Sequence, residues 1–155
     1  MIKTIAFDLN GVLINQIKRK NSIQPKLAKR FDIKNKNWVE IIRPIIKLSL
    51  SGRITKKELI KRAAIILNEN NKKIKKAIIL FYKKPFNLNN ILLNISKKLR
   101  KRLYKVIIIS NIDHITKDSL FKNKSFEHFD IKILSCDIKS SKPSEKIFKI
   151  ALKKS

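Results

Sequence analysis

The sequence predicts an α/β protein with a Rossmann-like parallel sheet and an inserted all-helical segment. Three short apolar runs, residues 2–9, 106–109 and 131–134, are rich in β-branched side chains, and each ends in small polar residues. Continuous apolar runs of this kind are typical of strands that are buried on both faces of a parallel sheet. Between the first two runs, apolar residues recur at helical spacing, so we expect the long connection to be helical.

The first predicted strand ends at a turn that contains a carboxylate. Asp8 closes the apolar run and is followed by Leu9, Asn10 and Gly11, residues that favour a turn. An aspartate at a strand end is often only a turn former or a helix cap. At the carboxyl end of a central parallel strand, however, it faces the crevice where such sheets bind ligands. There a carboxylate can act as a nucleophile that accepts a phosphoryl group.

The connection between the first two strands predicts a series of amphipathic helices. Pro44 should kink or split the first of them, and Gly52 should end it. The second begins at a capping box, Thr55 to Glu58, in which side chains and backbone bond reciprocally. The last leads directly into the second strand with an apolar stripe of Ile91, Leu92, Ile95, Leu99 and Leu103. These helices are expected at residues 38–49, 56–67, 74–81 and 91–103.

Polar residues also end the second strand and begin the last helix. The hydroxyl of Ser110 and the backbone N–H groups of the Ser110–Asn111 turn are donors suited to phosphate oxygens, although such residues also simply terminate strands. Lys142 stands just before Ser144, the expected cap of the last helix, so its ammonium and the helix dipole can act on one anion. A phosphate between Asp8, Ser110 and Lys142 would meet a nucleophile, donors and a cation.

Three segments carry a resemblance to a known family. Residues 7–13 (FDLNGVL), 107–111 (IIISN) and 142–148 (KPSEKIF) resemble the first three motifs of the haloacid dehalogenase (HAD) superfamily, in its phosphatase-like branch with a helical cap. Residues 51–59 and 126–130 look like further segments of that branch. Each motif is weak alone, and the three in order at suitable spacing are a strong signal.

The resemblance implies both an architecture and an activity. Residues 1–14 and 86–155 are expected to form the α/β core, and residues 15–85 the helical cap. The implied activity is that of a cytoplasmic HAD-like hydrolase, a phosphatase that acts on a small phosphomonoester. In that interpretation Asp8 is the nucleophile, while Ser110, the Asn111 backbone and Lys142 hold the phosphoryl group. Mg²⁺ would bind Asp8 and the backbone carbonyl of Asn10.

Two departures from the family pattern weaken the expected site. Asn10 stands where the family's phosphatases usually carry a second Asp, and an amide hydrogen-bonds but cannot shuttle a proton. The family's fourth motif, an acidic pair after a further strand, has no counterpart before Ser155. We therefore expect a carboxyl-truncated family member with an incomplete magnesium site and an open first-strand edge, which a second polypeptide or a dimer partner would cover. If the chain completes its own metal site, Asp113 and Asp137 are the first candidates.

Three other interpretations remain open at this point. Asn10 and the missing acidic motif favour a non-catalytic HAD-fold domain that binds a phosphorylated ligand or partner. A metal-free hydrolase of the dehalogenase kind also lacks the second Asp, but that branch tends to place an aromatic residue at this position. The last of the three is a basic nucleic-acid binder.

The net charge of +27 is a weak argument for nucleic-acid binding. Lys, Ile and Asn make up nearly half of the 155 residues, which points to a biased genome, and the lysines are spread through every segment without interleaved aromatic residues. We expect no specific nucleic-acid partner. Cys136 is the single cysteine and cannot form an internal disulfide, and no apolar run approaches the roughly 18 residues of a membrane span. These features predict a soluble, reduced protein with no membrane partner.

Overall fold

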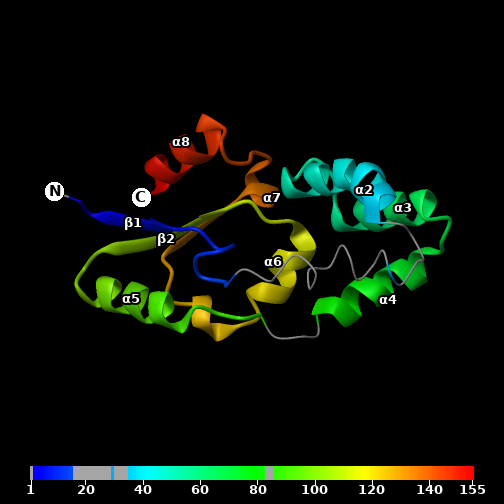
Figure 1. Ribbon diagram of the computed structural model, residues 1–155. Coiled ribbons are helices and arrows are strands. Elements are labelled where there is room, and N and C mark those ends of the chain that lie inside the picture. The colour runs from blue at the N-terminus through cyan, green and yellow to red at the C-terminus, as the bar shows by residue number, and fades with distance from the viewer. Residues whose placement is uncertain (1, 16–28, 30–34, 83–85) are drawn as a thin grey trace.

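The computed structural model describes residues 2–15, 29, 35–82 and 86–155 of the chain (Figure 1). Helices cover both faces of a small sheet, and three further helices lie at the end of the molecule away from the two termini. In chain order the elements are β1 (Thr4–Phe7), α2 (Asn35–Leu50), α3 (Lys56–Ile66), α4 (Asn71–Tyr82), α5 (Asn90–Lys101), β2 (Lys105–Ser110), α6 (His114–Leu120), the 3-10 helix η2 (Lys124–Phe126), β3 (Ile131–Leu134), α7 (Ser135–Ile138) and α8 (Glu145–Lys154).

The sheet is parallel and has the strand order β1-β2-β3. Phe7 is aligned with Ile108, and Ser110 with Leu134, so all three strands end at the same edge of the sheet. This confirms the predicted α/β class with adjacent parallel strands. Within the described residues β1 pairs only with β2, so its other edge is open. Helices α2, α3, α4 and α5 show that the described part of the long connection is mainly helical.

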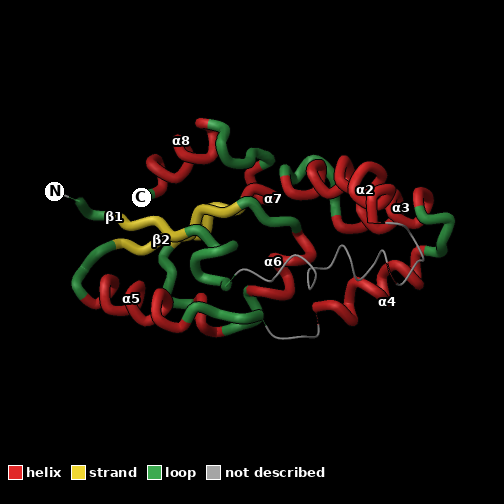
Figure 2. Tube along the Cα trace, in the orientation of Figure 1, coloured by secondary structure: helices red, strands yellow, loops and turns green. Residues whose placement is uncertain are grey.

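The central strand β2 divides the sheet into two packing faces. Val106 and Ile108 belong to a core that includes Leu93 of α5, while Ile107 packs with Ile147 of α8. The alternation follows from the two-residue period of a strand, which sends successive side chains to opposite faces. As a result α5 and α8 cover opposite faces of the sheet (Figure 2). Within the described residues no helix is both long enough and apolar enough to span a bilayer.

Helices α2, α3 and α4 share a separate apolar cluster. Its buried members include Ile42 and Ile45 of α2 and Ile74 of α4, and Ile115 of α6 joins them from the sheet side. Since this cluster is largely distinct from the core around β2, the insertion has its own packing. The division of the chain into core and cap at residues 15–85 stays a prediction, because residues 16–28, 30–34 and 83–85 lie outside the described residues.

Pro44 was expected to kink or split its helix, and the expected split is wrong. Helix α2 is one element from Asn35 to Leu50 with Pro44 inside it. Pro44 is exposed, while Ile42 and Ile45 on either side of it are buried. The lost backbone hydrogen bond therefore does not interrupt the apolar face that packs the helix, and that packing keeps it in one piece.

The start of α3 is the one that the sequence predicts. The Thr55 hydroxyl accepts the Glu58 backbone N–H at 3.2 Å, and Glu58 accepts the Thr55 backbone N–H at 2.7 Å. These two bonds satisfy N–H groups that have no partner within the helix. The hydrogen bonds from Thr55 also hold the pKa of the Glu58 carboxyl below its usual range.

Helix α5 buries only part of the expected apolar stripe, because Leu92 and Leu99 pack against the core while Leu103 lies beyond the end of the helix. Ile91 is 74% exposed and Leu103 is 95% exposed, whereas Leu93 and Ser96 are buried. The apolar residues of this helix cover more than one stripe, and only the side that faces β2 and the loop before β3 is packed. The Ser96 hydroxyl donates to the Leu93 carbonyl at 2.8 Å and lies 2.7 Å from Nε2 of His128.

We predict that His128 makes the fold less stable in acid. Burial, together with the charges of Lys97 and Arg100, lowers the pKa of its imidazole. Protonation therefore favours the unfolded chain, so stability is full above the unfolded pKa of about 6.5 and falls as the pH drops through the lower folded value. His128→Gln should show a smaller loss of stability between pH 7.5 and pH 5, measured as the urea midpoint. If wild type and His128→Gln lost equal stability, His128 would not be the cause, because all other acid-sensitive groups are the same in both proteins.

Candidate active site

Asp8 and Ser110 lie at the same edge of the sheet. Asp8 directly follows β1, and Ser110 is the last residue of β2. The parallel pairing of β1 with β2 points both strand ends in one direction. The candidate site therefore lies where open parallel sheets bind ligands, outside the carboxyl ends of the strands.

Lys142 lies against the carboxylate of Asp8. The Lys142 Nζ atom is 2.8 Å from Asp8 Oδ2, and it also donates to the carbonyl oxygen of Ile109 at 3.2 Å. The other carboxylate oxygen, Asp8 Oδ1, accepts the backbone N–H of Leu9 at 2.7 Å. The side chain of Lys142 is 25% exposed and that of Asp8 is 36% exposed. Solvent thus reaches the ion pair, which contributes little to stability but places a cation beside the carboxylate.

The loop after β1 holds Asp8 in position. The N–H of Leu13 donates to the Asp8 carbonyl at 3.4 Å, and the side chains of Leu9 and Leu13 are fully buried. Gly11 has a φ of 81°, a backbone conformation that glycine adopts without steric cost. Asn10 is exposed in this loop.

The side chain of Asn111 anchors the backbone of Lys142. Its amide nitrogen donates to the Lys142 carbonyl at 2.9 Å, and its amide oxygen accepts the Lys142 N–H at 2.7 Å. This pair of bonds ties the segment before α8 to the end of β2. The motif at residues 107–111 predicts a role for the Asn111 backbone only, and the positioning role of its side chain was not predicted. The placement of an amide side chain at the strand end was the available signal, since Asn can bond to backbone in both directions.

The hydroxyl of Ser110 is buried and has no hydrogen-bond partner among the described residues. A buried hydroxyl without a partner costs about 1 to 3 kcal/mol. Its O–H donor is therefore unused among the described residues. Because the residue is sealed from solvent, an anion reaches it only after neighbouring side chains shift.

A cavity of about 600 Å³ lies between the end of α2 and the segment that carries Lys142. Two basic side chains from the insertion, Lys47 and Arg53, face Asn111 and Ser141 of the sheet side across it. The remaining lining residues are Pro44, Leu48, Leu50 and Ser51. The cavity thus joins the helical insertion to the candidate site and is positively charged.

The two acidic residues expected as spare metal ligands are engaged elsewhere. Asp113 caps α6, where its carboxylate accepts the N–H groups of Ile115 and Thr116 at 2.8 and 3.0 Å. Asp137 accepts a hydrogen bond from Lys117 at 2.6 Å. Among the described residues, the one cluster of three or more His, Cys, Asp or Glu side chains does not include Asp8. No further carboxylate cluster completes the site at Asp8 in this part of the chain.

Comparison with protein-family models identifies the family to which this fold and site belong. The model for haloacid dehalogenase-like hydrolases matches residues 2–155. The chain belongs to this family. The assignment to the HAD superfamily, expected from residues 7–13, 107–111 and 142–148, is thereby confirmed.

Solved structures agree with the HAD-like fold. A HAD family enzyme from Bacteroides thetaiotaomicron, in its magnesium complex, is 26% identical with a TM-score of 0.75, covering 99% of this chain and 77% of that one. The wild-type enzyme in complex with magnesium and inorganic phosphate is 24% identical (TM-score 0.72, 99% and 79%). A HAD-like family hydrolase from Porphyromonas gingivalis is 22% identical (TM-score 0.76, 100% and 77%). No curated protein matches the sequence of this HAD-like hydrolase.

Proposed function

We propose that this HAD-like hydrolase is a phosphatase that acts on a small phosphomonoester through an aspartyl-phosphate on Asp8. The observation that carries the proposal is the 2.8 Å ion pair between Lys142 and Asp8 at the carboxyl edge of the sheet. It places a cation within reach of any phosphoryl group that Asp8 could attack. The Bacteroides relative that binds magnesium and inorganic phosphate adds support.

In the proposed mechanism an oxygen of the Asp8 carboxylate attacks phosphorus. The bond from phosphorus to the ester oxygen breaks, and the leaving alkoxide takes a proton from water because Asn10 has none to give. A water molecule then attacks the phosphorus of the aspartyl-phosphate, which releases inorganic phosphate and restores the carboxylate. Lys142 offsets the negative charge, and Ser110 and the Asn111 backbone N–H donate to the phosphoryl oxygens.

Mg²⁺ fits the oxygen donors of this site, although few of them come from the protein. The Asp8 carboxylate and the Asn10 carbonyl are hard ligands of the kind that Mg²⁺ takes. Since no cluster of three ionisable ligands forms around Asp8 in the described residues, water and substrate phosphate supply the others. The ion is therefore held weakly. When bound, it supplies charge neutralisation at the phosphoryl oxygens.

The helical insertion acts as the cap in this proposal. Its packing is separate from the core around β2, and its residues Lys47 and Arg53 line the cavity beside Asn111. Two cations at the cavity favour a substrate with negative charge. Substrate selection thus belongs to α2 and the turn after it.

Steady-state turnover of an aryl phosphate, with and without Mg²⁺, tests the proposed function. The wild-type protein should show magnesium-dependent turnover that Asp8→Asn abolishes. The matched control is Asp118→Asn, since Asp118 is an exposed carboxylate paired with Lys56, and this variant should keep its activity. Phosphate binding without turnover would favour the non-catalytic alternative, and turnover that survives Asp8→Asn would exclude the proposed nucleophile.

Phosphate affinity should depend on Lys142 more than on an exposed lysine. We predict that Lys142→Ala weakens binding of inorganic phosphate several-fold, because the ammonium lies at the proposed phosphate position. Lys72 is an exposed residue of α4, so Lys72→Ala acts only through screened, long-range charge at about 0.15 M salt. Calorimetric titration of both variants measures the difference. Equal effects would show that bulk basicity explains the binding.

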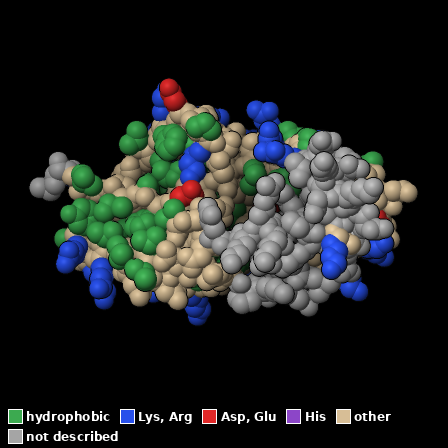
Figure 3. Space-filling model, in the orientation of Figure 1, with side chains coloured by type: hydrophobic (Ala, Val, Ile, Leu, Met, Phe, Trp, Pro, Cys, Tyr) green, Lys and Arg blue, Asp and Glu red, His purple; other side chains and the backbone are tan. Residues whose placement is uncertain are grey.

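A partner polypeptide would bind at the open edge of β1. The helices that flank the sheet leave large apolar side chains exposed, with Ile91 of α5 at 74% and Leu152 of α8 at 77%, and Ile2 before β1 is 73% exposed. Figure 3 shows hydrophobic side chains gathered on this side of the molecule, away from the insertion. An unpaired edge with apolar flanks is a template for a further strand. Because two copies at +27 each repel, we favour a second polypeptide over a dimer.

Adding a strand in trans tests this partner proposal. The carboxyl-terminal segment of a full-length relative should raise both the solubility and the thermal midpoint of the chain, since it would cover apolar surface at the β1 edge. The control is the same segment with proline in its strand, which cannot complete the hydrogen-bond ladder. No change with the first segment, or the same change with both, would contradict the proposal.

A further inference from the structure

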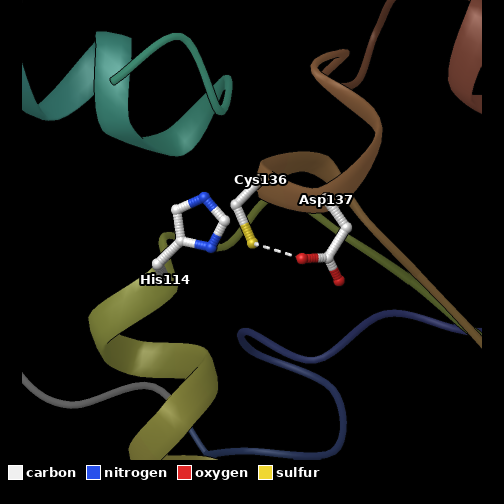
Figure 4. Close-up of side chains that lie close together, drawn as sticks. All are labelled: His114, Cys136 and Asp137. Atoms are coloured by element: carbon white, nitrogen blue, oxygen red, sulfur yellow. Dashed lines mark hydrogen bonds between the residues drawn. The ribbon is translucent and has the colours of Figure 1, made fainter. Parts of the chain in front are cut away.

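A second cluster of reactive side chains lies at the junction of α6 and α7. His114 is the first residue of α6, and Cys136 and Asp137 belong to α7. One potential ligand atom from each residue lies within 4.8 Å of the other two. In Figure 4 the His114 ring and the Asp137 carboxylate lie on either side of the Cys136 sulfur. None of the three residues has a role in the proposed phosphatase site.

The surrounding structure holds the cysteine of this cluster in place. Cys136 is buried, and its carbonyl packs so closely on Gly52 that a β-carbon there would lie 2.4 Å from the oxygen. The neighbouring Ser135 hydroxyl accepts the Ile112 N–H at 2.9 Å and donates to the Leu50 carbonyl. Two segments of sequence far from α7 thus fix the position of the thiol.

The other two ligands have room to adjust. His114 is half-buried and Asp137 is exposed, so their side chains can rotate without disturbing the core. Zinc ligands stand about 2.0 to 2.3 Å from the metal, which places them roughly 3.3 to 3.8 Å from each other in a tetrahedral site. The observed spread of 4.8 Å therefore needs a closure of about an ångström, within the reach of these two rotations.

We propose that His114, Cys136 and Asp137 bind a zinc ion at a site separate from Asp8. A nitrogen, a sulfur and an oxygen are the ligand types of zinc, whereas Mg²⁺ takes oxygen ligands. Three protein ligands leave a fourth position for water. The bound ion joins the start of α6 to α7, beside the last turn of α2.

Metal binding displaces one ammonium and one proton that the cluster holds without metal. Lys117 donates to Asp137 at 2.6 Å, and this hydrogen bond raises the pKa of its ammonium. Burial and the charge of Asp137 raise the pKa of the Cys136 thiol to about 12. The zinc ion displaces the Lys117 ammonium from Asp137, and the zinc–sulfur bond forms as the thiol proton passes to water.

Cobalt titration of the untagged chain tests the zinc site. Co²⁺ should give a thiolate-to-cobalt charge-transfer band, which Zn²⁺ abolishes by competition and Mg²⁺ does not. Cys136 is the only cysteine of the chain, so such a band identifies its source. Its absence from the wild-type protein would overturn the proposal.

Matched variants distinguish this site from adventitious binding. His114→Gln and Asp137→Asn should each weaken zinc binding at least ten-fold, while His128→Gln and Asp118→Asn should leave it unchanged. Lys117→Gln should strengthen it several-fold, because the competing ammonium is gone. Since His114 and Asp137 are not buried, their variants should keep the fold, which circular dichroism checks. Equal affinities across all of these variants would refute the site. Asp8→Asn should not alter zinc affinity, so the outcome is independent of the phosphatase proposal.

Discussion

Replacing Asn10 by aspartate should raise the turnover of phosphomonoesters by about 100- to 10,000-fold, the usual contribution of a general acid or base. Asn10 is exposed in the loop directly after Asp8, and in the proposed mechanism a carboxyl group there would act on the leaving oxygen and on the attacking water. An amide at this position hydrogen-bonds but carries no transferable proton. The gain should be larger for alkyl than for aryl phosphates, because an alkoxide needs the proton more than a phenoxide does.

The control for this gain is Asn15→Asp. Asn15 lies in the same loop region, is exposed and bonds to Asn87 at 3.2 Å, so the variant adds the same charge without a path to the substrate. Its turnover should match the wild type. Asn10→Asp combined with Asp8→Asn should be inactive. A rate unchanged in Asn10→Asp would show that proton transfer does not limit the reaction, or that Asp8 is not the nucleophile.

Replacing Gly52 by alanine should destabilise the protein by about 3 kcal/mol or more. Gly52 has a φ of 66°, a left-handed conformation that costs an L-residue roughly 1 to 2 kcal/mol. A β-carbon would also lie 2.4 Å from the Cys136 carbonyl oxygen and 2.9 Å from its carbon and Cα. These are backbone atoms, so the end of α2 must move away from α7.

Urea unfolding of Gly52→Ala and Gly11→Ala separates the conformational cost of a positive φ from the steric cost of the clash with Cys136. Gly11 also has a positive φ, 81°, but it is exposed, so its substitution should cost about the conformational term of 1 to 2 kcal/mol. The larger loss in Gly52→Ala then measures the close approach between α2 and α7. Equal losses would mean that the two segments separate at little cost.

Local sequence patterns predict the strands, the best-marked helix start and the strand ends that meet at the site. The run at residues 131–134 is β3 to the residue, and the capping box at Thr55 forms as expected. These features are local, since β-branched runs and capping residues act through their immediate neighbours. The placement of Asp8 and Ser110 at one edge followed from one further step, that parallel strands end at the same edge.

Which helix surfaces are buried depends on long-range packing and could not be predicted from local patterns. Periodicity marked Ile91 and Leu103 as core, but Ile91 lies on the exposed side of α5 and Leu103 lies in the turn after it. The packed side is that of Leu93, with Leu92 and Leu99 partly buried beside it. Likewise Pro44 passes through α2, because packing on either side outweighs one lost hydrogen bond. A propensity is a local preference of about 1 kcal/mol, or about 3 for proline, and burial of several side chains exceeds it.

The side-chain partners at the site also could not be predicted from the sequence. Asn111 binds the backbone of Lys142, and Asp137 lies with Lys117 and Cys136 instead of Asp8. These contacts join residues up to 31 positions apart, and they depend on how the loops after β2 and β3 turn. The pattern of residues tells which strand end carries a polar group, but the direction of that group is set by the loop backbone and by the side chains packed around it.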